Sequence, residues 1–89
     1  MDKPYTDKCN GNVITRHFSV NVPIGDLVWE KNEKNYKTLV VNGEGWSLQF
    51  DNEDPNELHA GEILLIPRNT YYRFLRGYTD LLIEITDCG

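Results

Sequence analysis

The chain has 89 residues, of which 39% are hydrophobic, so it is long enough for one folded domain and too apolar for a disordered chain. The net charge is -5 with nine Lys and Arg residues, which leaves no basic face for nucleic acid. No apolar run approaches the roughly 18 residues that span a bilayer, and the polar start lacks the apolar core of a signal peptide. We expect a soluble, cytoplasmic protein, a single domain over residues 1–89, with neither a membrane nor a nucleic-acid partner.

Alternating apolar and polar side chains predict a series of short β-strands. The first covers residues 12–22, where Ile14, Phe18, Val20 and Val22 share one parity and Arg16 is the exception. Asn42-Gly43 is a strong hairpin turn signal, and the alternation of apolar and polar residues resumes after it. No stretch of the sequence has the spacing of apolar residues that a helix requires. The further strands are predicted at residues 26–30, 36–41, 46–50, 62–66, 71–75 and 80–86. So many short strands indicate an all-β sandwich or barrel.

Charge is unevenly distributed along the chain. Between Thr38 and Pro67 there is no Lys or Arg, but there are six acidic residues: Glu44, Asp51, Glu53, Asp54, Glu57 and Glu62. Three of the four arginines follow within nine residues, at positions 68, 73 and 76. We interpret the acidic stretch as a solvated loop. The two cysteines, Cys9 and Cys88, lie near the two ends; they are reduced in a cytosolic chain, or bonded if the terminal segments pair.

The stretch from Gly61 to Arg76 resembles the second sequence motif of the cupins. Gly61 and Pro67 stand at the spacing of that motif, and Asn69 replaces its turn glycine. Tyr72 occupies the position of the metal-binding histidine, and Arg76 that of the asparagine.

Upstream, residues 25–43 resemble a degenerate first cupin motif. Counting back from Gly43 puts Tyr36 at the position of the motif's glutamate, with Glu30 and Asn32 near its two histidines. The chain therefore resembles a small single-domain cupin of the RmlC-like superfamily with a degenerate metal site. The resemblance implies a small antiparallel cupin-type β-barrel with jelly-roll, double-stranded β-helix topology.

The residues at the matched positions differ chemically from a cupin metal site. Such a site usually has two or three histidines and a glutamate, which suit Fe, Mn, Ni or Zn. Tyr36 and Tyr72 are phenols with an ordinary pKa near 10, so they are poor ligands at neutral pH. His17 and His59 lie away from the matched positions; His59 is interpreted as a surface histidine and His17 as a surface or interface histidine. We therefore expect no metal and no other cofactor.

The resemblance also places five candidate residues around one cavity, with Trp29 or Trp46 nearby: Glu30, Asn32, Tyr36, Tyr72 and Arg76. Two interpretations stay open. In the first, aromatic walls and polar groups bind a small carboxylate, phosphate or sugar, with Arg76 holding an anion. In the second, Tyr36, Tyr72 and Phe74 plug the interior and Arg76 pairs with Glu30.

These observations predict a metal-independent binding or interaction module without catalysis. The alternative is a metal-independent isomerase or epimerase acting on a sugar or small carboxylate, with Tyr72 or Tyr36 as acid and Glu30 as base. A metal-dependent cupin enzyme is the third interpretation, and the sequence leaves open whether the chain is an enzyme. We also expect a homodimer, because both parities of residues 81–85 are apolar and Leu82 would then meet a partner.

Overall fold

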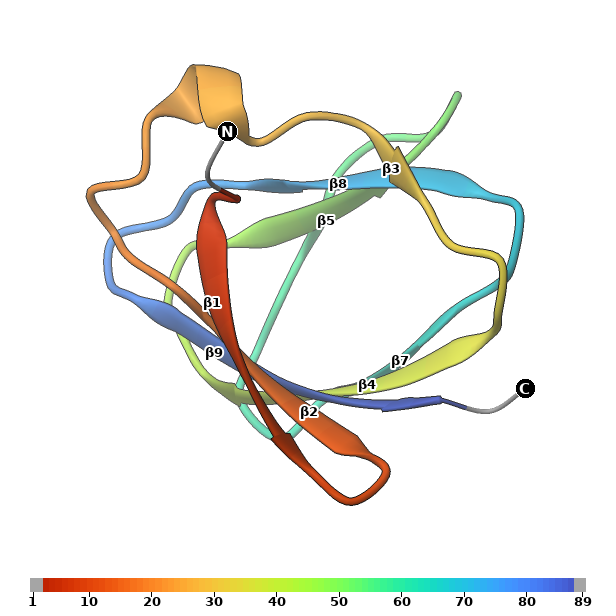
Figure 1. Cartoon of the computed structure of the whole chain (residues 1–89). Helices are drawn as coiled ribbons and strands as arrows, with labels where there is room; N and C mark the ends of the chain where they lie inside the picture. Colours follow the sequence, from red (N-terminus) through yellow and green to blue (C-terminus); the bar gives the residue numbers. More distant parts are fainter. Residues whose placement is uncertain (1–2, 88–89) are drawn as a thin grey trace.

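A computed structural model describes residues 3–87 and shows two antiparallel β-sheets (Figure 1). The larger sheet has five strands in the order β1-β2-β9-β4-β7, and the smaller has four in the order β3-β8-β5-β6. The strands are β1 (Tyr5–Asn10), β2 (Val13–Phe18), β3 (Glu30–Lys31), β4 (Tyr36–Asn42), β5 (Ser47–Phe50), β6 (Asn56–Glu57), β7 (Ile63–Ile66), β8 (Tyr71–Leu75) and β9 (Leu81–Asp87). The predicted all-β, antiparallel class is confirmed.

The sheets of the predicted cupin-type β-barrel are not closed into a barrel. Within residues 3–87 the hydrogen-bonded strand pairs fall into two separate sheets, which face each other as a sandwich. The reason lies at the edges of the smaller sheet: β3 and β6 have two residues each, and each pairs only with its neighbour inside that sheet. Such short edge strands offer no ladder that could join the larger sheet.

Four elements differ from the sequence prediction. No strand was predicted over β1, where all residues apart from Tyr5 and Cys9 are polar. β6 lies inside the stretch that was expected to be a loop, and a short 3-10 helix spans Ile24–Asp26. The strand predicted over residues 12–22 ends at Phe18, because the Val22 N–H turns back to the Ser19 carbonyl at 3.1 Å.

Aromatic rings fill the middle of the sandwich. Phe18 lies 5.6 Å from Trp46 and 5.2 Å from Phe74, measured between ring centroids, and Phe74 makes an edge contact with Tyr72 at 6.1 Å. All four rings are at most 4% exposed, and the Trp46 indole N–H donates to the Thr79 carbonyl. The interior is therefore plugged by aromatic side chains at its centre, as one of the two interpretations of the sequence expected for Tyr72 and Phe74.

The described part of the chain contains no helix with the length and apolar character that crossing a bilayer requires.

Candidate functional site

Three of the five candidate residues come together where β3 meets β8. Glu30 on β3 is the register partner of Tyr72 on β8. Asn32 follows β3, and its Nδ2 donates a hydrogen bond to the Tyr72 hydroxyl at 3.0 Å. Both contacts follow from strand pairing, since directly opposite residues share a face of the sheet. Glu30, Asn32 and Tyr72 thus form one polar group at the margin of the aromatic core.

The other two candidates lie elsewhere. Tyr36 begins β4 in the larger sheet and packs, half-buried, against the core. Arg76 follows the far end of β8, where its Nη1 donates to the Val22 carbonyl at 3.1 Å, and it is exposed. The structure therefore separates Arg76 from Tyr72, and the alternative pairing of Arg76 with Glu30 gives way to this backbone contact. Trp46 belongs to the core.

A partly buried ion pair that the sequence did not predict lies beside this polar group. Arg16 on β2 contacts Asp7, its register partner on β1, through two hydrogen bonds: Nε to Oδ1 at 2.9 Å and Nη2 to Oδ2 at 3.0 Å. The Arg16 guanidinium also stacks on the Tyr5 ring, 3.8 Å from its centroid. The available signal was Arg16 itself, the one charged side chain on an otherwise apolar strand face.

The environment keeps the buried phenols protonated. Burial raises the pKa of Tyr72 to about 12, although the hydrogen bond from Asn32 acts in the opposite direction. Burial also raises the pKa of Tyr5, while the neighbouring Arg16 charge lowers it. Desolvation penalises the charged form of a phenol in both cases. At neutral pH these hydroxyls therefore act as hydrogen-bonding groups.

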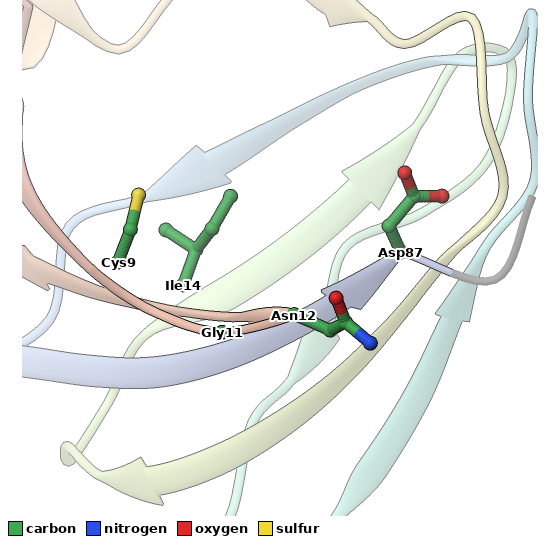
Figure 2. A pocket seen from close by; sticks show the side chains of 5 residues that line it. All are labelled: Cys9, Gly11, Asn12, Ile14 and Asp87. Atoms are coloured by element: carbon green, nitrogen blue, oxygen red, sulfur yellow. The ribbon is translucent and has the colours of Figure 1, made fainter.

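A hollow of about 500 Å³ lies at one end of the sandwich, between the β1–β2 turn and the end of β9 (Figure 2). It is lined by Cys9, Gly11, Asn12, Ile14 and Asp87. Cys9 and Ile14 are register partners. Cys9 lies two residues from Asp7 along β1, and Ile14 lies two residues from Arg16 along β2. Side chains two residues apart share a face of a strand, so the hollow and the ion pair lie on the same inner face. Asp87 at the rim accepts a hydrogen bond from Lys34 Nζ at 3.0 Å.

The donor atoms at the matched cupin positions do not suit a transition metal. Tyr72 stays protonated at neutral pH, and Asn32 uses its Nδ2 as a donor to that hydroxyl. This leaves the Glu30 carboxylate as the good ligand at those positions. Among residues 3–87, moreover, no three His, Cys, Asp or Glu side chains are grouped as a metal would require. His17 contacts Asp80 on the outside of the larger sheet.

Two expectations concern the cysteines and Leu82. Cys9 is exposed at the rim of the hollow, and the disulfide considered from the sequence involves Cys88, which lies outside the described residues. Leu82 is half-buried and lines a hollow on the outside of the larger sheet with the mostly polar side chains of Thr6, Lys8, Thr15 and His17.

Comparison with known proteins gives the fold. No protein-family model matches the chain, and no curated protein matches it in sequence. A cupin domain from Bordetella pertussis superposes with a TM-score of 0.65 at 16% identity, over 100% of this chain and 99% of that one. A cupin-2 domain containing protein from Shewanella frigidimarina gives 0.67 at 15% identity, over 98% and 84%.

A third solved structure with a similar fold is described as a double-stranded β-helix. An RmlC-like cupin family protein with a double-stranded β-helix fold, from Methanocaldococcus jannaschii, has a TM-score of 0.66 at 15% identity, over 97% of this chain and 82% of that one. Identities this low establish shape and leave the activity undetermined. The two sheets, their strand order and these three superpositions agree: the chain has the fold of a small cupin domain, the double-stranded β-helix.

Proposed function

We propose that the chain is a metal-independent, non-catalytic binding protein that takes a small neutral polyhydroxylated molecule, such as a sugar, at the open end of its sandwich. The observation that carries this proposal is the hollow of about 500 Å³ beside the Asp7–Arg16 pair. Its lining combines an amide, a carboxylate and backbone groups of a tight turn with one apolar wall, Ile14. Such a concave, partly apolar site with a few polar groups is typical of small-ligand binding.

The charges near this hollow favour a neutral ligand over an anion. Two cations near it already have acidic partners: Arg16 is paired with Asp7, and Lys34 with Asp87. Arg76, which the sequence offered as the anion-binding group, bonds the Val22 carbonyl instead. A carboxylate or phosphate would therefore meet no uncompensated cation among these groups, whereas sugar hydroxyls can donate to carboxylates and accept from the Asn12 amide.

The residues at the matched cupin positions do not favour acid–base catalysis. Tyr72 is 2% exposed, so a substrate has no access to its hydroxyl. Its raised pKa makes it a weak acid at neutral pH, and the hydroxyl is held by Asn32. An isomerase or epimerase needs an acid and a base within hydrogen-bond reach of the substrate. These observations support binding without turnover.

A thermal-shift titration tests the proposal with defined probes: D-glucose, D-mannose and L-rhamnose, then D-glucose 6-phosphate, succinate, MnCl2 and ZnCl2. A ligand that binds only the folded state raises the melting temperature, by an amount that corresponds to about 2.7 kcal/mol at one hundred times its dissociation constant. We expect a saturable rise with at least one neutral sugar and none with succinate, Mn²⁺ or Zn²⁺. Asn12→Ala should weaken the response at least about tenfold, the effect of losing roughly 1.4 kcal/mol of binding.

Asn21→Ala is the matched control, because Asn21 is exposed in the turn after β2, at the opposite end of the hairpin from Asn12. This variant should respond to sugar as the wild type does. A shift with Mn²⁺ or Zn²⁺ at stoichiometric concentration would contradict metal independence. Responses to the phosphate and carboxylate probes alone would contradict a neutral ligand, and equal sugar responses in both variants would place the site elsewhere.

A further inference from the structure

The outer face of the smaller sheet holds two aromatic rings, each with a cation stacked on it. The Arg73 guanidinium lies 4.5 Å from the centroid of Trp29, and Lys31 Nζ lies 5.1 Å from that of Tyr71. Strand pairing builds this arrangement, since Lys31 is opposite Tyr71 on β3 and β8. Trp29 is 39% exposed and Tyr71 is 47% exposed. We call these four side chains the cationic platform.

The Arg73 guanidinium is held in place but lacks an acidic partner. Its Nε donates to Gln49 Oε1 at 2.8 Å, and Gln49 is its register partner on β5. No carboxylate of residues 3–87 lies within ion-pair distance of Arg73 or Lys31. A guanidinium fixed on an aromatic ring presents its remaining N–H groups as a fork that fits a carboxylate. The cationic platform therefore presents two cations without a carboxylate partner among the described residues, although the chain has 14 acidic residues and only nine basic ones.

The complementary charge adjoins the platform on the same chain. The loop from β5 to β6 carries Asp51, Glu53 and Asp54, all exposed, and we call residues 51–54 the acidic loop. It begins beside the platform, because the Asp51 N–H donates to the Tyr71 carbonyl at 3.0 Å. Figure 1 shows this loop leaving the end of β5 close to β3 and β8. The loop and the platform therefore lie at one edge of the same sheet.

We propose that this edge is a self-association surface, on which the cationic platform of each chain receives the acidic loop of a second copy. Exposed Trp, Tyr and Arg side chains are the residue types that dominate protein–protein binding energy. Neighbouring patches of opposite charge are self-complementary, because a second copy turned by half a revolution brings each patch over its counterpart. The surface thereby gives the expected homodimer an interface other than Leu82. It also gives roles to the acidic stretch and to one of the clustered arginines.

Charge reversal with rescue tests this interface. Sedimentation equilibrium should show a concentration-dependent dimer of the wild-type chain at low ionic strength, weakened at about 1 M salt, where the screening length falls to roughly 3 Å. Arg73→Glu and the loop variant Glu53→Lys/Asp54→Lys should each raise the dimer dissociation constant at least about tenfold. Combining the three substitutions should restore dimerisation. The loop variant changes only exposed side chains, so its effect does not depend on Arg73→Glu folding normally.

Two control variants separate this interface from other surfaces. Arg68→Glu reverses an exposed arginine outside the platform, and Leu65→Asp alters the exposed apolar residues of the edge strand β7, where Leu65 is 69% exposed. Both should dimerise as the wild type does. A wild-type chain that stays monomeric at all concentrations would overturn the proposal. So would a dimer that Leu65→Asp dissociates while the loop variant leaves it intact.

Discussion

Replacing Asp7 by Asn tests how much of the stability depends on the partly buried ion pair of Asp7 and Arg16. The Arg16 side chain is 9% exposed and that of Asp7 is 30% exposed, so the substitution leaves a nearly buried guanidinium without its carboxylate. Removing one partner of a fully buried pair costs about 3–5 kcal/mol. Because water reaches part of Asp7, and because Tyr5 still covers the guanidinium, we expect a smaller loss of about 2–3 kcal/mol. For a domain of this size, that lowers the melting temperature by roughly 10–20 °C.

The paired replacement gives the opposite expectation. Arg16→Met combined with Asp7→Leu removes both charges and fills the space with apolar atoms, and such swaps are often neutral or stabilising. The double variant should therefore lie within about 1 kcal/mol of the wild type, well above Asp7→Asn. Urea unfolding followed by tryptophan fluorescence measures all the variants, since Trp46 is fully buried and reports loss of the core.

Two results would refute this reasoning. If Asp7→Asn costs less than about 0.5 kcal/mol, the range of ordinary surface changes, solvent already compensates Arg16 and the pair is not a buried one. If the double variant loses as much stability as the single variants Arg16→Met and Asp7→Leu do together, the charges contribute independently and the hydrogen-bonded pair has no coupling energy. Either outcome would also weaken the argument that Arg16 is unavailable to an anionic ligand.

Two further predictions follow from the core. Burial raises the pKa of Tyr72 to about 12, so the folded state favours its neutral phenol; the resulting stability is full below about pH 10 and is lost as pH rises through 12. Tyrosinate absorbance should show this late-titrating group, and Tyr72→Phe should remove it; titration together with the exposed tyrosines would contradict the assigned burial. Gly77→Ala should destabilise by about 2 kcal/mol or more in urea unfolding, because a Cβ there would clash with the Glu44 carbonyl and the Trp46 backbone N. Gly25→Ala, with open space around it, is the matched control, and equal effects of the two substitutions would contradict the packing.

The fold could be predicted because its evidence is local. Alternation of side chains along a strand shows which face is buried, and most of the longer strands carry that alternation clearly, as Leu81, Ile83 and Ile85 do on β9. β1 lacks the signal: its inward positions are Tyr5, Asp7 and Cys9, of which only Tyr5 is buried, so its strand character comes from pairing with β2. The strand pattern left a sandwich and a barrel both open, since closure depends on whether edge strands meet, which is a property of three-dimensional placement.

The structure brings three of the five candidate residues together, whereas side-chain parity alone missed the position of Arg76 and the partner of Arg16. Parity predicted one strand face for Tyr72 and Arg76, but Arg76 lies just beyond the end of β8 and bonds the Val22 carbonyl. Four residues along a strand span about 13 Å, so equal parity does not bring Arg76 to Glu30. Conversely, Arg16 was visible as the exception on an apolar face, yet its partner could not be named without knowing that β1 is a strand. Once β1 pairs with β2, Asp7 must stand opposite Arg16, and the charged residue on the apolar face becomes one half of a partly buried ion pair. A lone charged residue in an alternating strand therefore predicts a partner on the adjacent strand, even where that strand has no sequence signal of its own.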